Sequence, residues 1–491
     1  MKNREVKGVH QGLRLTDPPS DAPGLTARGL RDALHNGEIK ASDAIEEFLA
    51  RSAEVQQIIN PFTFIDAEGA RTRARESDKR IADGNPRSLE GVPVAIKDLT
   101  PMAGHPHTMG SLVMRNVVAT VSDPAVQRLV DAGAIPFART NTAEFGCATV
   151  TDNLLYGETL NPWNMDYSPA GSSGGAAAAL ASFATPLAQG TDSAGSLRMP
   201  ASACGVVGMK PSYGVVPVSA PAYLDPFGHN GPMARNVDDV RLMFDVMAGI
   251  DDRQGFGYEV RRRDTVRSLS GLRSRVFKSI LGLSIDRDVA KNLDVACGEL
   301  SNAGVEIVEV DFPWDFERLF NCVKNAFAMT YMPLARSARD SGIAVTDLTN
   351  AFIEDVMPCT TDGMQAVRAQ SEMAELHAAI GKHLSESDFL ILPTLAMPAP
   401  IAHDHFIDSG PLVNGVEHED RWIVALTVPF NLMSACPAIT IPSGISKMGV
   451  PTGLQLVGQP YEDYRLLDIA ELAESVMPGL SSQLDRMKIG E

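Results

Sequence analysis

The stretch from 171 to 210 constrains the fold of this chain more than any other. It reads GSSGGAAAALASFATPLAQGTDSAGSLRMPASACGVVGMK. Ala and Leu are strong helix formers, so we expect the first glycines at a helix N-terminus rather than in a flexible linker. Such a terminus offers free N–H groups and a positive dipole end to an anion. The later segment TDSAGS is expected to form a tight loop that exposes a serine hydroxyl and several N–H groups.

Two other interpretations of the glycine-rich segments are less favoured. A phosphate-binding loop is excluded because no GK[ST] follows Gly175. The nucleophile elbow G-x-S-x-G is matched literally by Gly171, Ser173 and Gly175, which would make Ser173 the nucleophile. An elbow needs an apolar strand directly before it, and the preceding residues NPWNMDYSPA contain two prolines.

Lys97 ends a second informative segment, GVPVAIKD at 91–98. The apolar residues before it predict a buried strand. A buried lysine favours its neutral form and can act as a general base once its pKa falls from ~10.4 toward ~7–8. Asp98 either opposes that fall or faces away, and the sequence leaves both options open.

Alternating helix and strand patterns indicate an α/β fold with helices on both faces of a sheet. Two early helices are expected to begin at caps formed by Thr26 and Ser42. Further helices are predicted at 67–83, 123–133, 237–249 and 463–477. Strands are predicted at 61–66, 91–96, 134–140, 305–311, 389–395, 437–442 and 453–458.

The order and spacing of these segments resemble the amidase signature family. The segments that carry the resemblance are AGSSGGAAAAL, GTDSAGSLRMPA, CGVVGMKPSYG, GPMAR and FNLMSACPAITIP with GVPTGLQLVG. They cover about residues 25–250 and 385–475. The resemblance implies an α/β/α sandwich in which a central mixed sheet is flanked by helices.

The residue patterns and this resemblance together divide the chain into four parts. Residues 1–70 are expected to form an N-terminal arm and helical layer, and 71–250 the amidase signature core. Residues 251–385 are predicted to be a variable, mostly helical insertion that shapes the substrate pocket. Residues 386–491 would complete the core.

The resemblance implies a Ser–Ser–Lys triad, and each member has a position here. The nucleophile falls on Ser196. The bridging serine, which the family usually places after a cis peptide bond, falls on Ser172, and the lysine of the Val-x-x-Lys-Asp motif falls on Lys97. Neutral Lys97 would take a proton through Ser172 while Ser196 attacks an amide carbonyl and forms an acyl-enzyme.

The oxyanion would be held by backbone N–H groups of the second loop. The residues implied are Ser193, Ala194 and Gly195, with Ser196 as a further candidate. Two positions depart from the family pattern, since Ala170 and Ala194 replace glycines. If residue 194 needs a positive φ, its alanine would be strained. Asp192 and Arg198 also fall on the motif, and we expect them to brace the loop.

The predicted function is therefore that of an amidase hydrolysing a carboxamide, with aryl amide, ester and carbamate substrates all open. The alternative is the glutamine-amidase subunit of a tRNA-dependent amidotransferase, although the Tyr-rich segment expected in its middle is not found. A catalytically dead binding protein is a third option, which the intact triad disfavours. The resemblance implies no cofactor and no metal. A small-molecule amide is the expected partner, and a homodimer is left open.

Composition narrows the class of partner further. The 491 residues carry a net charge of −18, with 44% hydrophobic and 21% charged residues. No basic patch stands out, so a nucleic-acid partner is not expected. The six cysteines are scattered without a CxxC pair, which suggests neither a disulfide framework nor a zinc cluster. No apolar run is long enough to span a bilayer, and the N-terminal residues lack an apolar signal core, so a cytoplasmic location without a membrane partner is expected.

A few other residues are weaker functional candidates. The histidines of HPH at 105–107 and HDH at 403–405 are expected to be loop residues, because neither pair belongs to a fuller ligand set. Cys147 and Cys204 lie near the predicted site in sequence, and we expect them to be packed small residues. His229, in PFGHNGP, is predicted to lie on a loop near the pocket and is a candidate substrate contact.

Overall fold

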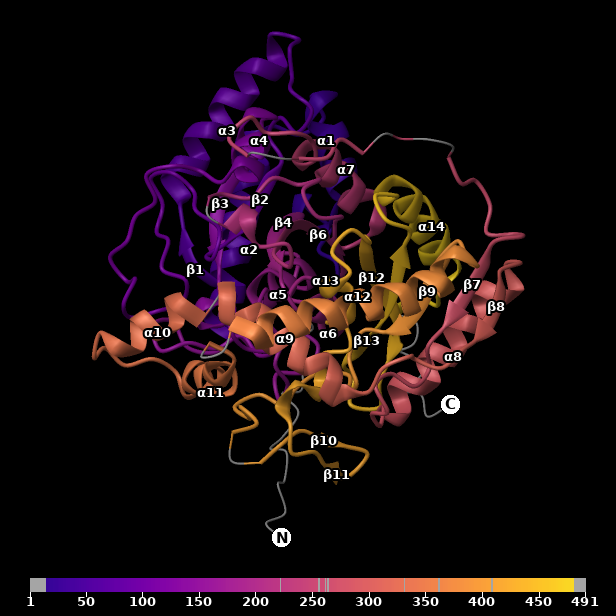
Figure 1. The fold of residues 1–491 in the computed structure, drawn as a ribbon. Coiled ribbons are helices and arrows are strands. Elements are labelled where there is room, and N and C mark those ends of the chain that lie inside the picture. The colour runs from indigo at the N-terminus through magenta and orange to yellow at the C-terminus, as the bar shows by residue number, and fades with distance from the viewer. Residues whose placement is uncertain are drawn as a thin grey trace.

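A large mixed sheet forms the centre of the molecule in a computed structural model of the chain (Figure 1). The structure describes residues 15–220, 222–254, 257–260, 262, 265–330, 332–360, 363–407 and 409–480. Within these residues, eleven strands join in the order β1-β3-β2-β4-β6-β5-β12-β13-β9-β7-β8. Helices flank the sheet, as the predicted α/β/α sandwich requires.

The strands have the following bounds: β1 Phe62–Ile65, β2 Pro93–Lys97, β3 Ile135–Thr140, β4 Leu187–Asp192, β5 Val207–Lys210, β6 His229–Ala234, β7 Arg273–Val276, β8 Glu306–Glu309, β9 Phe389–Pro393, β12 Ala438–Ile445 and β13 Pro451–Gly458. A separate hairpin pairs β10 (Leu412–Val413) with β11 (Val416–Glu417). The sheet is parallel between β2 and its neighbours β3 and β4, and antiparallel from β4 through β6, β5, β12 and β13 to β9. Every strand predicted from the sequence is confirmed.

The helices have these bounds: α1 Ala27–His35, α2 Ala41–Ile59, α3 Ala67–Ala82, α4 Pro124–Asp131, α5 Gly174–Ala181, α6 Arg198–Cys204, α7 Val237–Met247, α8 Arg287–Asn302, α9 Phe316–Thr330, α10 Met332–Asp340, α11 Asp347–Val356, α12 Gly363–Ser385, α13 Pro429–Leu432 and α14 Asp463–Val476. Short 3-10 turns include η2 (Glu144–Gly146) and η5 (Arg421–Val424). The predicted cap of α1 is confirmed, because the Thr26 hydroxyl accepts a hydrogen bond from Gly29 N at 3.0 Å.

The predicted cap of α2 is wrong. Ser42 lies inside the helix, and Lys40 occupies the N-cap position without a side-chain bond. The carboxylate of Asp78, from α3, instead accepts hydrogen bonds from Ala41 N and Ser42 N. A carboxylate from a neighbouring helix therefore satisfies the free N–H groups that a local serine was expected to satisfy.

Two strands extend the sheet from the segment predicted as a variable insertion. β8 matches a predicted strand, whereas β7 has no counterpart among the predicted strands. β7 pairs in parallel with both β8 and β9. Its residues, RSRV, show little apolar alternation, so only the neighbouring strands reveal its pairing. The helices α9, α10 and α11 of the same segment pack on one another at the lower left of Figure 1.

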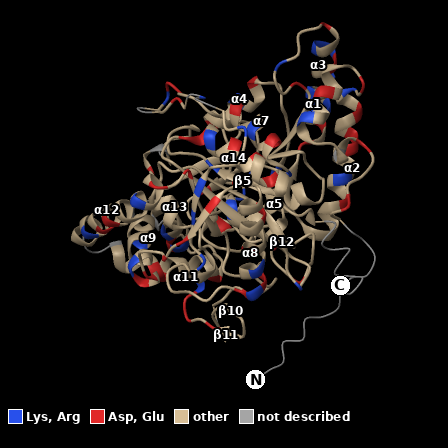
Figure 2. Ribbon diagram, turned by 90° about the vertical axis from the view of Figure 1, so that its right-hand side faces the viewer, with Lys and Arg blue, Asp and Glu red and all other residues tan. Residues whose placement is uncertain are grey.

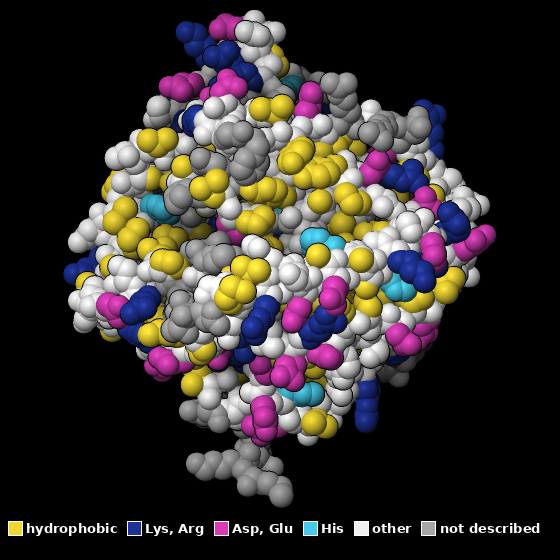
Figure 3. Space-filling view, viewed as in Figure 1, with side chains coloured by type: hydrophobic (Ala, Val, Ile, Leu, Met, Phe, Trp, Pro, Cys, Tyr) yellow, Lys and Arg dark blue, Asp and Glu magenta, His cyan; other side chains and the backbone are white. Residues whose placement is uncertain are grey.

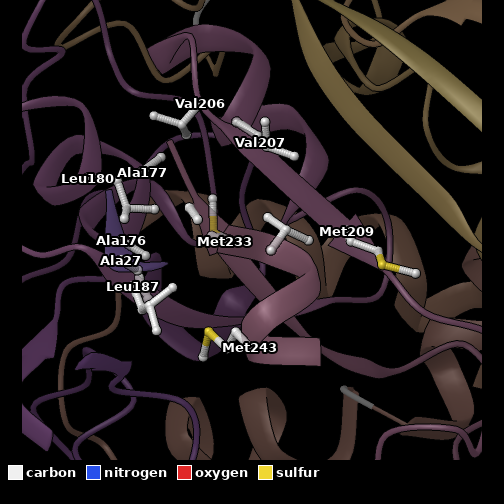
Figure 4. Close-up of a cluster of buried hydrophobic side chains, with 14 of the residues drawn as sticks. Ala27, Ala176, Ala177, Leu180, Leu187, Val206, Val207, Met209, Met233 and Met243 are labelled. Carbon is white, nitrogen blue, oxygen red and sulfur yellow. The ribbon is translucent and has the colours of Figure 1, made fainter. Parts of the chain in front are cut away.

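The Ala-rich helix α5 lies deep in the core, where all eight of its residues are buried. It contacts β2, β4 and β6, while α6 contacts β5, β12 and β13. Figure 4 shows Ala176, Ala177 and Leu180 of α5 among strand residues such as Leu187 and Met233. Small side chains on the helix let it approach the sheet closely, which positions the turn at its N-terminus.

The distribution of charged and hydrophobic side chains differs from one face of the molecule to another. In Figure 2, Lys and Arg are interspersed with Asp and Glu along α1, α2 and α3. Figure 3 shows hydrophobic side chains across the middle of another face, with charged side chains below and to the right of them. Among the helices of the described residues, none combines the length and apolar character needed to cross a bilayer.

Candidate active site

Lys97 stands at the carboxyl end of β2, and its side chain is fully buried. β2 lies between β3 and β4, so the end of this strand is enclosed on both sides. The Nζ atom lies within hydrogen-bond distance of three hydroxyl oxygens, Ser172 Oγ and Ser173 Oγ at 2.7 Å each and Thr191 Oγ1 at 2.9 Å. Its hydrogen-bond partners are thus neutral hydroxyls.

Burial lowers the pKa of Lys97 well below its usual value, and the charge of Asp192 offsets only part of this effect. The adjacent Asp98 does not bond to the amine. Its carboxylate accepts from Thr108 N at 3.1 Å and Thr108 Oγ1 at 2.5 Å, and it lies 3.4 Å from Arg139 Nη2. Of the two options that the sequence left open, the structure supports the one in which Asp98 faces other partners.

The two serines that contact Lys97 come from the turn before α5. The peptide bond between Gly171 and Ser172 is cis. Ser173 donates its own hydroxyl proton to the carbonyl oxygen of Thr191 at 3.2 Å. Residues 161–170, all described, contain no strand of the sheet, so the strand that a nucleophile elbow requires is absent and that alternative is wrong.

Ser196 lies in the loop between β4 and α6, and the carboxylate of Asp192 organises this loop. Asp192 accepts hydrogen bonds from Gly195 N at 2.7 Å and Leu197 N at 3.2 Å. Arg198 contacts both of its oxygens at 2.9 Å. Burial alone would raise the pKa of Asp192, but Arg198 holds it well below the usual range. Asp192 and Arg198 therefore brace the loop as expected.

The backbone conformations of this region show which of the two alanines that replace family glycines has a positive φ. Gly195 has φ +115°, a value that side chains rarely permit, and its N–H is bound to Asp192. That N–H therefore supports the loop in this structure, whereas Ser193 and Ala194 line the pocket. Ala194 is absent from the residues with positive φ, so the anticipated strain lies instead at Ala170, with φ +60°.

A narrow pocket opens beside these loops. It brings together the catalytic candidates Ser172 and Ser196 with Thr191, Ser193 and Ala194. The remaining lining residues are Leu99, Gly146, Cys147, Ala148, Thr149, Met199, Phe327, Phe352 and Trp422. Among these described residues, none carries a charged side chain. The three aromatic rings lie 5.7–6.3 Å apart, centroid to centroid, and form one wall.

A family model described as Amidase matches residues 43–467, which is most of the chain. The chain belongs to the amidase signature family. It is 30% identical to a glutamyl-tRNA(Gln) amidotransferase subunit from Desulforapulum autotrophicum, over 93% of this chain and 98% of that protein.

Solved amidase signature structures share its fold. A 6-aminohexanoate cyclic dimer hydrolase complexed with substrate matches with a TM-score of 0.79 at 26% identity, covering 94% of this chain and 98% of that one. A bacterial aryl acylamidase of the same family matches with a TM-score of 0.84 at 24% identity, covering 95% and 99%. The chain is therefore an enzyme of the amidase class, which acts on the C–N bonds of amides.

His229 does not occupy the place predicted for it in this amidase signature fold. It begins strand β6 rather than lying on a loop, and it is absent from the lining of the pocket that contains Ser196. Its Nδ1 lies 2.8 Å from the carbonyl oxygen of Phe227 and 3.2 Å from that of Asp192. Burial, reinforced by the charge of Lys210, lowers the pKa of His229 to about 3. It therefore packs against the end of β4, and it lines a different pocket together with Tyr213 and Gln254.

The other candidates have structural partners. The loop histidines contact Ala103 and Asp66 (His105), the carbonyl of Leu99 (His107), Glu158 (His403) and Asp152 (His405). Within the described part of the chain, no group of three His, Cys, Asp or Glu residues could hold a metal ion. Cys147 and Cys204 are buried, which raises the pKa of both thiols.

Several residues of the amidase signature site were not found from the sequence. Thr191 is a third hydroxyl on Lys97, and the signal for it was present in the GTDSAGS segment. The aromatic wall was missed, because Phe327, Phe352 and Trp422 come from α9, α11 and η5, which only the tertiary fold brings together.

Proposed function

We propose that this chain hydrolyses an uncharged carboxamide through an acyl-enzyme on Ser196, with Ser172 and Lys97 as the proton relay. The neutral Lys97 amine accepts a proton from Ser172 Oγ as Ser172 takes one from Ser196 Oγ. The Ser196 oxygen then bonds to the amide carbon. Ser172 returns the proton to the departing amine, and water cleaves the acyl-enzyme by the same relay. The burial of Lys97 and its 2.7 Å contact with Ser172 support this scheme.

The roles of the two adjacent serines follow from where their hydroxyls face. Lys97 Nζ is equally close to both. Ser173 donates its proton to the carbonyl of Thr191 and does not line the pocket. Ser172 lines the pocket together with Ser196. We therefore assign the relay to Ser172 and a supporting role to Ser173.

The oxyanion formed in this reaction requires hydrogen-bond donors near the acylated serine. The backbone N–H groups of Ser193 and Ala194 are our candidates, because both residues line the pocket beside Ser196. Gly195 would act through its bond to Asp192, which keeps the loop in place.

The composition of the pocket wall supports the substrate class and is the single observation on which it rests. Three aromatic side chains and several small apolar ones face the predicted nucleophile, and no charged side chain is among the described lining residues. Burying a charged group without a partner costs several kcal/mol. A neutral amide with an apolar or aromatic substituent fits this wall. Esters and carbamates of the same shape fit it as well.

The alternative is the glutamine-amidase subunit of a tRNA-dependent amidotransferase. The name of the relative from Desulforapulum autotrophicum favours it. Glutamine, however, carries an ammonium and a carboxylate, and the described pocket lining offers no charged partner for either. Hydrolysis of a neutral aryl amide by this chain alone would favour the first proposal. Activity on glutamine only in the presence of further subunits would favour the second.

Covalent labelling with a fluorophosphonate, followed by peptide mapping, tests the proposal. Modification of Ser196 in the wild type and its loss in Ser196→Ala are expected. A label on Ser173 or no label at all would overturn the assignment. Hydrolysis should persist in EDTA, because the relay requires no metal. A cytoplasmic location and a homodimeric state stay predictions.

A further inference from the structure

The turn η2, from Glu144 to Gly146, touches the proposed catalytic centre on one side. Gly146 lines the pocket, and a methyl group built on it would lie 3.4 Å from Ser172 Oγ and 2.9 Å from Leu99 Cδ1. The preceding Phe145 is buried with φ +54°, a left-handed conformation that a bulky residue rarely adopts. The turn is thus tightly packed against the relay serine.

The other side of the same turn binds helix α11, about two hundred residues later in the chain. Glu144 is 2% exposed, and its Oε2 accepts hydrogen bonds from Thr346 N at 2.7 Å and from Thr349 Oγ1 at 2.9 Å. The helix has its own N-cap, since Thr346 Oγ1 accepts from Thr349 N at 3.0 Å. The cap satisfies the N–H of Thr349, and the carboxylate satisfies that of Thr346 while it links the helix to the core.

Helix α11 carries one ring of the aromatic wall and holds a second one by a hydrogen bond. Phe352 lies on the helix and lines the pocket. Asp355, one turn later, accepts from Trp422 Nε1 at 3.0 Å and from Arg421 Nη2 at 2.5 Å. The rings of Phe352 and Trp422 are 6.3 Å apart. The position of this one helix therefore sets the position of two of the three aromatic rings.

We propose that Glu144 is a positioning residue that fixes α11 against the catalytic core and thereby sets the selectivity of the pocket for an aromatic group. This inference rests on the proposed function, because it assumes that Ser196 is the nucleophile in this pocket. Glu144 does not touch the substrate. It acts through the helix that carries Phe352 and through Asp355, which holds Trp422.

The bonding of Glu144 supports a positioning role over a purely structural one. Its second oxygen, Oε1, is buried without a hydrogen-bond partner among the described atoms. This buried oxygen carries a desolvation cost that the bonds from Oε2 to α11 have to offset. All of the bonds that Glu144 makes to α11 use Oε2, so an amide of the same shape can preserve them.

The experiment compares labelling of Ser196 by two fluorophosphonates that carry a small alkyl group or an aryl group on phosphorus. The measured quantity is the ratio of the aryl to the alkyl second-order rate constant. Glu144→Ala should lower this ratio about tenfold, the size expected when an apolar pocket loses one or two methylenes of contact. Glu144→Gln, which retains the Oε2 acceptor, should keep the wild-type ratio.

A second variant reaches the same link from the helix side. Thr349→Val removes the Oγ1 donor but leaves Glu144 and the turn beside Ser172 unchanged. It should lower the aryl-to-alkyl ratio in the same direction by a smaller factor. It also tests the inference if Glu144→Ala does not fold. In a Phe352→Ala background, Glu144→Ala should have a smaller effect than in the wild type, because the contact made by Phe352 is already lost and only the effect through Trp422 is left.

The failures of the two proposals can be told apart. Equal losses of both rate constants in Glu144→Ala, with an unchanged ratio in Thr349→Val, would overturn the inference and leave the proposed function intact. A full, additive effect of Glu144→Ala in the Phe352→Ala background would do the same. Absence of a label on Ser196 in the wild type would overturn the proposed function and the inference together.

Discussion

Replacing Gly195 by alanine tests the geometry of the loop that carries Ser196 most directly. A Cβ atom built on Gly195 would lie 1.8 Å from Oγ1 of Thr427 and 2.6 Å from its Cβ. Thr427 is fully buried and donates through that same oxygen to the carbonyl of Ala194 at 2.6 Å. The added methyl group therefore cannot be accommodated unless the loop or Thr427 moves.

The cost has three sources that the structure identifies. A φ of +115° is strained for alanine, at about 1–3 kcal/mol. Forcing a methyl group into packed surroundings costs about 1–3 kcal/mol more. Displacing Thr427 breaks its hydrogen bond to Ala194, which is worth about 1 kcal/mol. The free energy of unfolding should fall by about 3–7 kcal/mol, a large part of the ~5–15 kcal/mol of a typical domain.

Urea unfolding of wild type and variant measures this loss, and fluorophosphonate labelling reports whether Ser196 stays reactive. Gly37→Ala is the matched control, because Gly37 has φ +73° but open space around it, so it isolates the backbone strain. Adding Thr427→Ala to Gly195→Ala removes the 1.8 Å contact and should restore part of the stability. Our reasoning is refuted if Gly195→Ala costs no more than Gly37→Ala, or if the double variant recovers nothing.

Four further predictions concern the same site. Because the proposed relay needs neutral Lys97, kcat/KM should fall as pH falls through its lowered pKa, which a pH–rate profile measures. The unfolded lysine binds a proton that the folded one lacks, so stability should rise with pH between the lowered pKa and ~10.4, and Lys97→Met should remove this slope in urea unfolding. Ala170→Gly should leave the free energy of unfolding nearly unchanged, because relief of ~1–2 kcal/mol of left-handed strain offsets the lost methyl group. Ala194→Gly relieves no such strain and should lower the free energy of unfolding by ~1–2 kcal/mol. Equal effects of the two variants in urea unfolding would contradict the assigned φ values. Asp192→Asn should cost ~3–5 kcal/mol in urea unfolding, since it leaves the buried Arg198 charge without its partner; a loss below ~1 kcal/mol would contradict this interpretation.

The fold could be predicted where local patterns decide it. Strands such as β2, β3, β9 and β13 are short apolar runs bounded by turn residues, and the helix α5 follows from its alanines. The order in which the strands pair could not be predicted from the sequence. β7 and β8 of the middle segment join the sheet next to β9, and the β7 residues lie about a hundred positions before their β9 partners. The cap of α2 failed for the same reason, since its acceptor comes from another helix.

In the candidate site too, features set by local motifs could be predicted and features set by tertiary contacts could not. Lys97, Ser172 and the loop around Ser196 lie in motifs whose order and spacing are visible in the chain, and the structure brings them to one place. The pocket wall was not predictable, because aromatic residues on separate helices give no local signal of a shared surface. The prediction for His229 failed because a Gly- and Pro-rich segment, typical of a loop, forms the buried strand β6.

The charges near Lys97 explain how a lysine can remain neutral in a site that contains carboxylates. The two carboxylates of the chain motifs are each paired with an arginine, Asp98 with Arg139 at 3.4 Å and Asp192 with Arg198 at 2.9 Å. Lys97 is left with hydroxyl partners, which can accept its hydrogen bonds without stabilising a positive charge as an ion pair would. The same hydroxyls offer a path for a proton. Burial therefore lowers the pKa of Lys97, the arginines limit how far the carboxylates oppose this effect, and the hydroxyls lead from the amine toward the proposed nucleophile.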